Sequence, residues 1–246
     1  MRRLVAIGSG KGGVGKTWLA VSLSHALARQ GFRILLVDCD VGLANVDVQL
    51  GLRWEAGFGH GSPSFAAIQT VQSMGIDVLP ARSGSSAALT LDLTLAEQLL
   101  MEIQTWRATY DLIVLDLPSG NEPGMRRLMM AADDPVLLTT EEPTALTDIY
   151  AVMKTIRKRL PVFQPKVIVN LVNDHQSGNR VYEGLSRVCN RFLMMRPDLL
   201  GSIRRDRRVV EAISRQTPLF QCYPHADAAQ DVMALTKTLV HHDRKT

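Results

Sequence analysis

The segment GSGKGGVGKT, residues 8–17, constrains the fold of this chain more than any other. It follows the apolar run LVAIG, which is typical of a buried strand, and precedes a run whose leucines and alanines recur at helical spacing. Gly10 to Thr17 match the pattern G-x-x-x-x-G-K-[ST] in the strand–loop–helix context that this pattern requires. Glycines let backbone N–H groups close around phosphates, and the positive end of the following helix adds to the attraction. The sequence therefore predicts a phosphate-binding loop.

Each residue of this loop has an expected role in binding a nucleotide and Mg²⁺. Lys16 is expected to contact the β- and γ-phosphates as a catalytic cation, and the Thr17 hydroxyl to ligate the metal. The remaining residues are expected to surround the phosphates with their backbone: Gly10, Lys11, Gly12, Gly13, Val14 and Gly15.

Carboxylates are expected beside the loop, at the ends of other strands. Asp116 ends the apolar run LIVL and is predicted to hold Mg²⁺ through water. Asp38 and Asp40 end the run VDCD, and such a pair can serve Mg²⁺ and the attacking water respectively. We therefore predict Asp38 as a metal residue and Asp40 as a catalytic one. Taken alone this pair is weak evidence, since strand ends are often acidic.

Short apolar runs alternate with amphipathic stretches along the whole chain, which predicts strands alternating with helices and a parallel sheet. The expected strands are Arg3–Gly8, Arg33–Asp38, Ile76–Pro80, Leu112–Asp116, Pro135–Thr140, Lys166–Val172 and Leu199–Ile203. The expected helices are Lys16–Gln30, Leu95–Ala108, Gly124–Ala132, Thr144–Arg159, Val181–Arg196, Arg207–Arg215 and Asp227–Val240. We expect one α/β domain, residues 1–246, with a doubly wound sheet covered by helices on both faces. The segment 57–64, GFGHGSPS, is expected to be a mobile surface loop.

The composition limits the remaining classes of protein. The chain has 246 residues, 46% hydrophobic and 21% charged, as in an ordinary globular domain. No apolar run approaches the roughly 20 residues that span a bilayer, and the start lacks the apolar run of about 7–15 residues of a secretory signal. The chain is therefore expected to be cytoplasmic. Its net charge of +4 permits contact with anionic lipid or nucleic acid without indicating it.

Two related chemistries are disfavoured by missing residues. Guanine recognition would need an N/T-K-x-D signature, and the nearest match, TKTL at 236–239, lacks the aspartate, so ATP is favoured over GTP. Cys39, Cys189 and Cys222 are odd in number and far apart, which argues against a disulfide framework and an iron–sulfur cluster. We expect them to be small, mostly buried residues.

The loop KGGVGKT resembles the deviant Walker A motif of the MinD/ParA family of ATPases. The resemblance extends over nearly the whole chain: residues 37–52 resemble switch I and DLPSG, residues 116–120, resembles switch II, with serine where alanine is usual. It implies a P-loop ATPase of MinD/ParA type that forms a homodimer on binding ATP. Within it, Lys11 would reach across to the partner's nucleotide, and Gly120 would belong to the nucleotide site.

The resemblance also implies where the base binds. Asn170, which ends the run KVIVN, matches the family position that reads adenine. Residues 201–219 are similar to a late segment that normally reads I-P-x-D and closes over the base. Here Arg204 stands at the proline position and Asp206 at the aspartate position, so both are expected cofactor-binding residues.

Within the family, residues 141–156 and the run GLANVDVQLGL are most similar to the FlhG (FleN) group of flagellar-number regulators. This similarity implies a slow, partner-stimulated ATPase that controls flagellar number or placement, with an FlhF-type GTPase or flagellar basal-body proteins as partners. FlhG proteins often carry an N-terminal D-Q-A-x-x-L segment that stimulates FlhF. No D-Q-A-x-x-L segment precedes the first expected strand of this sequence. Stimulation of an FlhF-type GTPase is therefore not among the predicted activities. The alternatives are division-site selection, partition of DNA or another cargo, and nucleotide binding without hydrolysis.

Two surface features bear on these alternatives. The arginines 204, 205, 207, 208, 187 and 191 could bind DNA backbone, but a solvated rim with acidic neighbours is favoured. The last helix has an apolar stripe at positions 229, 232, 233, 236 and 240, and MinD and FlhG proteins use such a helix for reversible contact with the inner face of the cell membrane. Packing on the chain's own domain is the commoner role of an amphipathic helix.

Overall fold

The computed structural model describes residues 2–42, 44–53, 57–59, 65–81 and 90–241. These residues form an eight-stranded sheet in the order β3-β4-β2-β5-β1-β6-β7-β8. Neighbouring strands run parallel, apart from β3, which is antiparallel to β4. The strands are β1 (Arg3–Ser9), β2 (Ile34–Asp38), β3 (Gln69–Val71), β4 (Ile76–Leu79), β5 (Leu112–Ser119), β6 (Asp134–Thr139), β7 (Lys166–Val172) and β8 (Asp198–Arg204).

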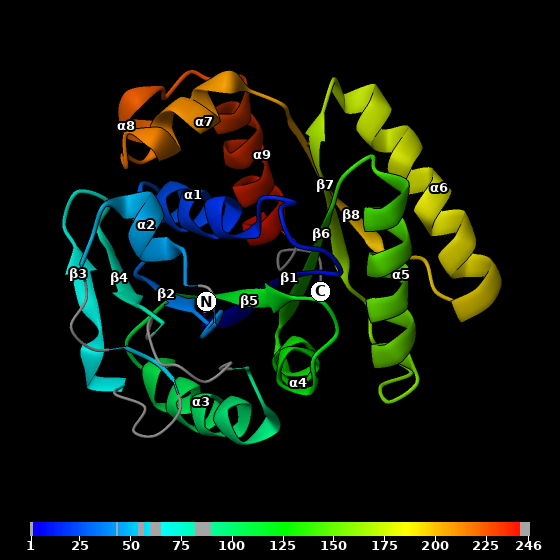
Figure 1. The fold of residues 1–246 in the computed structure, drawn as a ribbon, viewed down its shortest axis with the longest axis horizontal. Coiled ribbons are helices and arrows are strands. Elements are labelled where there is room, and N and C mark those ends of the chain that lie inside the picture. The colour runs from blue at the N-terminus through cyan, green and yellow to red at the C-terminus, as the bar shows by residue number, and fades with distance from the viewer. Residues whose placement is uncertain (1, 43, 54–56, 60–64, 82–89, 242–246) are drawn as a thin grey trace.

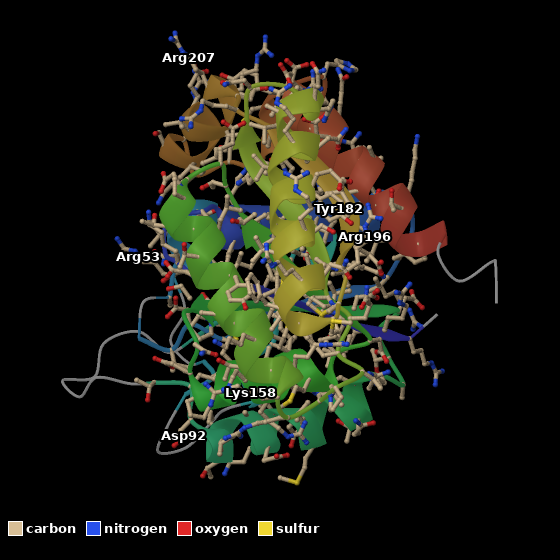
Figure 2. The ribbon with its side chains drawn as sticks, turned by 90° about the vertical axis from the view of Figure 1, so that its right-hand side faces the viewer. Arg53, Asp92, Lys158, Tyr182, Arg196 and Arg207 are labelled. Atoms are coloured by element: carbon tan, nitrogen blue, oxygen red, sulfur yellow. The ribbon has the colours of Figure 1, made fainter. Side chains whose placement is uncertain are left out.

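Helices cover both faces of this sheet, with a separate hydrophobic core on each (Figure 1). The helices are α1 (Lys16–Ala28), α2 (Val46–Leu50), α3 (Leu93–Trp106), α4 (Pro123–Ala131), α5 (Pro143–Arg157), α6 (His175–Leu193), α7 (Arg207–Ser214), α8 (Leu219–Cys222) and α9 (Asp227–His241), with a 3₁₀ turn at Phe65–Ala67. One core joins the sheet to α1 and α9, and the other joins it to α3, α4, α5 and α6. The doubly wound architecture expected from the sequence is confirmed. Figure 2 shows α5 and α6 side by side at one end of the molecule.

The expected strands and helices are all present, β7 with the predicted bounds and the others with shifted ends. The largest shift is at α6, which begins at His175 instead of Val181 because Asp174 caps it. The Asp174 carboxylate accepts the Ser177 N–H, and the Ser177 side chain pairs with the Asp174 backbone, which forms a capping box. The short elements β3, α2 and α8 were not predicted, since three to five residues carry little periodicity.

The expectation of a mobile surface loop over residues 57–64 is wrong for its first three residues. Gly57, Phe58 and Gly59 are buried, and Phe58 forms a parallel bridge with Ala81. The Phe58 side chain is fully inaccessible to solvent and belongs to the α3-side core, since a large aromatic ring gains most from burial there. Residues 60–64 lie outside the described ranges.

The apolar stripe of α9 packs against its own domain. Ala229, Val232 and Thr236 are fully buried, and the Gln30 side chain of the α1 end donates a hydrogen bond to the Thr236 hydroxyl at 2.8 Å. The described part of α9 therefore offers these residues to α1 and β8 rather than to a membrane. Within the described ranges, no helix combines the length and the apolar character that crossing a membrane requires.

Candidate nucleotide site

The loop between β1 and α1 has a backbone suited to wrapping an anion. Gly13 and Gly15 have φ of 78° and 94°, a left-handed conformation that side chains with a Cβ rarely adopt. Gly10 packs against α5 so closely that an added Cβ would lie 2.3 Å from the Asp148 carbonyl carbon. Successive N–H groups in such a conformation form a concave site for phosphates at the start of α1.

Lys16 lies buried beside three carboxylates, and its contact with phosphates stays a prediction. Burial lowers the pKa of the Lys16 ammonium, while the charges of Asp116, Asp40 and Asp38 oppose that shift. The carboxylates come together because β2 and β5 are neighbours and Asp38 stands opposite Asp116 in their register. The parallel sheet therefore assembles one lysine and three acids at the carboxyl ends of its central strands.

The Asp116 carboxylate is buried with one of its two oxygens unpaired. It accepts a hydrogen bond from the Thr17 hydroxyl, but its Oδ1 atom is buried without a hydrogen-bond partner. Burial raises the pKa of Asp116 to about 6, against the opposing effects of Thr17 and Lys16. An unpaired buried carboxylate oxygen next to a hydroxyl is a donor set that suits Mg²⁺. Thr17 and Asp116 therefore fit the predicted metal site.

Asp38 has a structural task that the sequence did not indicate. Its Oδ1 accepts the Asp40 N–H at 3.0 Å, and its Oδ2 accepts the N–H groups of Asn45 and Val46 at 3.3 Å. Burial, followed by the charge of Asp116, raises the pKa of Asp38 well above its ordinary value. Asp38 thus holds the segment between β2 and α2, including the half-buried Asp40, at the site. Its contact with a metal stays a prediction.

The Lys11 side chain contacts the start of α5. Its Nζ donates to the Glu142 carboxylate at 2.6 Å and to the Thr144 hydroxyl at 3.2 Å. The hydrogen bond and charge of Lys11 lower the pKa of Glu142. In this chain the two lysines of the loop are therefore in different surroundings, one buried among acids and one half-exposed on a surface ion pair.

A cavity of about 400 Å³ opens next to the phosphate loop, bordered by Gly13 and Gly15 on one side and by residues 203–213 on the other. Asn170 lies in its wall, where its amide donates to the Val14 carbonyl at 2.8 Å and its Oδ1 is buried without a partner. Leu171 follows with φ of 59°, where the register of β7 against β8 shifts. Such irregularities redirect side chains. The unpaired Asn170 oxygen could accept the amino group of an adenine.

The other predicted cofactor residues are near this site but differ in what they contact. Arg204 and Asp206 border the cavity, but the Arg204 side chain bonds to α9, and the Asp206 carboxylate accepts N–H groups of α7 and α9. Gly120, with φ of 97°, follows β5, and its N–H donates to the Ser9 carbonyl at 2.9 Å beside the phosphate loop.

Sequence reasoning missed residues whose role depends on distant contacts. Glu142 and Thr144 hold Lys11 from 131 and 133 positions away, without a local signal. Trp18 follows the loop directly and lines the cavity together with the apolar residues Ile203, Val209 and Ile213. A tryptophan directly after the G-K-[ST] end of the loop could have drawn attention to a stacking surface.

Comparison with known proteins places this geometry among nucleotide-binding domains. The model of the CobQ/CobB/MinD/ParA nucleotide binding domain matches residues 5–219. The chain is 31% identical over 230 residues to the antiactivator FleN of Pseudomonas aeruginosa, covering 92% of this chain and 82% of FleN. It is 28% identical over 227 residues to the septum site-determining protein MinD of Bacillus subtilis, covering 89% and 82% respectively.

The fold is similar to that of known structures. The septum site-determining protein MinD of Pyrococcus horikoshii, determined in complex with Mg-ADP, aligns with a TM-score of 0.77 at 24% identity, covering 97% of this chain and 96% of that one. At this identity the likeness shows a shared fold.

Proposed function

Because the chain belongs to the family of CobQ/CobB/MinD/ParA nucleotide-binding domains, we propose that it is an ATPase that binds ATP with Mg²⁺ and dimerises in that state. The observation that carries this proposal is the continuity of the site. The same glycines, Gly13 and Gly15, border both the phosphate cradle and the cavity that holds Asn170. A triphosphate on the loop would therefore direct its base to the unpaired Asn170 oxygen.

Each residue of the site has a separate role in the proposed hydrolysis. Lys16 would bind the β- and γ-phosphates, and the Thr17 hydroxyl and the Asp116 carboxylate would hold Mg²⁺, the carboxylate through water. When bound, Mg²⁺ neutralises charge on the phosphate oxygens. Asp40, placed by the Asp38 carboxylate, orients the attacking water. Gly120 and the segment from Arg204 to Asp206 complete the nucleotide site.

Lys11 supplies its charge to the nucleotide of the facing subunit. Its half-exposed ammonium pairs with Glu142, and Lys16 is the lysine that would bind the phosphates of the same subunit. A cation supplied in trans stabilises charge on the partner's phosphates and couples turnover to dimerisation. The protein then acts as a switch whose nucleotide state orders a surface for a partner.

We propose control of flagellar number or placement as the biological role, with an FlhF-type GTPase or a flagellar basal-body protein as partner. The similarity to FleN over 92% of the chain supports it. The similarity to MinD of Bacillus subtilis keeps division-site selection as the alternative. Partition of DNA has less support, because Arg204 is paired with Asp227 and Asp231, which leaves part of the arginine cluster unavailable to phosphates.

The test is made in the organism from which the gene comes. We expect a chromosomal Lys16→Ala substitution to abolish ATP binding by the purified protein and to change the number of flagella per cell in electron micrographs. Minicells or filaments with unchanged flagella would instead assign the protein to division. Loss of plasmid or nucleoid inheritance would assign it to partition. Normal ATP affinity of the variant by calorimetry would contradict the nucleotide site itself.

A further inference from the structure

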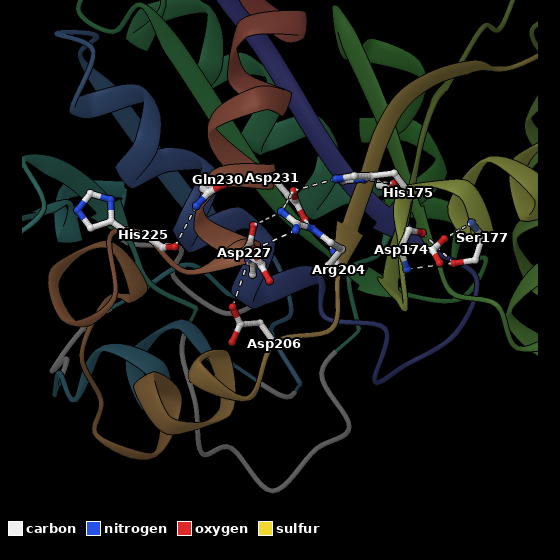
Figure 3. A network of polar contacts seen from close by, with 11 residues as sticks. Asp174, His175, Ser177, Arg204, Asp206, His225, Asp227, Gln230 and Asp231 are labelled. Carbon is white, nitrogen blue, oxygen red and sulfur yellow. Dashed lines mark hydrogen bonds and ion pairs between the residues drawn. The ribbon is translucent and has the colours of Figure 1, made fainter.

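Helix α9 contacts one wall of the cavity of about 400 Å³, which is the proposed binding site of the base. The Arg204 N–H and Nε donate to Oδ2 of Asp231 at 2.9 and 3.0 Å, and Arg204 Nη2 donates to Oδ1 at 2.8 Å (Figure 3). Arg204 Nη1 reaches the Asp227 carboxylate at 2.9 Å. One arginine at the end of β8 thus joins two carboxylates on successive turns of α9.

The Asp231 side chain is buried within this contact. It is 4% exposed, whereas the side chain of Asp227 is 56% exposed. His175 Nε2 lies 3.2 Å from Oδ1 of Asp231, and His175 Nδ1 lies 2.9 Å from the Ser202 hydroxyl. The Asp231 carboxylate therefore ties the end of β8 and the start of α6 to one turn of α9.

Asp206 makes a second connection between the cavity wall and α9. Its Oδ1 accepts the Arg208 N–H at 2.9 Å, which caps α7, and its Oδ2 accepts the Ala228 N–H at 3.4 Å. The segment 204–207 borders the cavity, and two of its residues, Arg204 and Asp206, bond to the first two turns of α9. A shift of α9 would move the surface that faces the base.

We infer that Arg204 and Asp231 are positioning residues for the base of the nucleotide, and that they couple base binding to the order of α9. This inference rests on the proposed nucleotide site. Neither residue has to touch the nucleotide. The Arg204–Asp231 pair sets the place of residues 205–207, and base binding in turn favours the docked α9, because coupling between two sites is reciprocal.

The binding test compares a ligand with a base to one without it. Asp231→Asn keeps the size of the side chain and removes its charge. We expect its Kd for Mg-ATP, measured by calorimetry, to rise about tenfold, the low end for losing a hydrogen bond to a charged group. Its Kd for inorganic triphosphate with Mg²⁺ should stay unchanged, since that ligand occupies only the phosphate loop. Equal losses for both ligands, or none for either, would overturn the inference.

The control is an exposed arginine–carboxylate pair far from the cavity. Arg196 donates to Glu183 at 3.2 Å and lies well away from Arg207, which borders the cavity (Figure 2). Arg196→Gln should leave both dissociation constants unchanged. Arg204→Lys keeps the charge but lacks the planar fork, so its Kd for Mg-ATP should fall between those of the wild type and Arg204→Ala. An Arg204→Ala protein with wild-type affinity would contradict the proposed role.

The second readout is hydrogen exchange in peptides that cover α9, residues 227–240. In the wild type, Mg-ATP should slow exchange there, and inorganic triphosphate should not. In Asp231→Asn, Mg-ATP should lose this effect. If ATP leaves α9 exchange unchanged in the wild type although it binds, the coupling is wrong while the nucleotide site stands. If the wild type binds triphosphate and ATP with equal affinity, the proposed base cavity fails instead.

Discussion

At the scale of single residues, the site brings two buried carboxylates together. Asp38 and Asp116 face each other across β2 and β5, and burial raises the pKa of both. Groups with perturbed pKa values of this kind mark sites where folding alone does not satisfy every charge. In the proposed role, the burial of Asp116 costs stability and leaves one carboxylate oxygen available to a metal.

The substitution Asp116→Asn should stabilise the protein in the absence of nucleotide at pH 7.5 while abolishing Mg-ATP hydrolysis. A buried acid whose pKa is raised to about 6 destabilises the fold above that pH, because the native state holds the proton more tightly than the unfolded chain. Stability contributed by the protonated form is lost as the pH rises through about 6. We expect a rise in Tm of roughly 2–8 °C at pH 7.5 for a gain of about 1–2 kcal/mol.

Thermal unfolding followed by circular dichroism at two pH values provides the check. Near pH 4 the wild-type Asp116 is protonated as well, so the difference in Tm between the two proteins should disappear. A variant that is less stable than the wild type at pH 7.5 would show that Asp116 contributes to the fold through contacts of its charged form.

Asp40→Ala should bind ATP and hydrolyse it at least about tenfold more slowly, as for losing a water-orienting group worth more than about 1.4 kcal/mol in the barrier. The variant should accumulate as a dimer with ATP and Mg²⁺, since binding is retained while turnover is slowed. Light scattering measures this state directly. A variant that stays monomeric under conditions where the wild type dimerises would assign Asp40 a structural role.

At the scale of elements, the contact between the phosphate loop and α5 governs how Lys11 is presented. Gly10 lies against the α5 backbone, and Lys11 pairs with Glu142 and Thr144 at the start of that helix. The ion pair is exposed, so it is weak and screened by salt. If Lys11 acts in trans, it leaves this pair when the dimer forms.

Glu142→Gln should therefore favour dimerisation. Removing the carboxylate frees the ammonium, and we expect ATP-dependent dimers to form at a protein concentration about two- to fivefold lower, as for an exposed ion pair. The difference from the wild type should shrink at high salt. Glu141→Gln, on an exposed neighbour, is the matched control and should change nothing. Weaker dimerisation of Glu142→Gln would mean that Glu142 holds Lys11 in its working position.

At the scale of the whole molecule, a lysine that acts in trans makes each site incomplete without a second copy. Turnover per chain should then rise with protein concentration until dimers dominate. Lys11→Ala should retain much of its ATP affinity as a monomer and lose both ATP-dependent dimerisation and turnover, because the missing charge belongs to the partner's site.

The sharpest test mixes Lys11→Ala with Asp40→Ala. One site of a mixed dimer keeps its own Asp40 and faces a subunit that still carries Lys11, so that site is complete. We expect partial recovery of hydrolysis in the mixture, measured by phosphate release. Mixed dimers that demonstrably form and stay as inactive as either parent would show that Lys11 does not act in trans.

The sequence alone determined the features whose cause is local. Gly13 and Gly15 adopt a left-handed backbone conformation that favours glycine, and the helix after the loop follows from its apolar periodicity. The apolar runs that end in Asp38 and Asp116 predicted that both carboxylates lie at the same edge of the sheet. The order of strands was decided by tertiary structure, since burial on both faces makes all central strands similarly apolar.

Only tertiary structure decided which partners those residues meet. Lys11 donates a hydrogen bond to Glu142, and Asn170 donates one to the carbonyl of Val14, 156 positions earlier in the chain. Arg204 donates hydrogen bonds to Asp231 of α9. These pairs depend on how β1, β7 and β8 are placed in the sheet and on α9 packing beside α1 and β8. The local sequence around Lys11, Asn170 or Arg204 does not indicate these partners, because each partner lies at least 27 positions away along the chain.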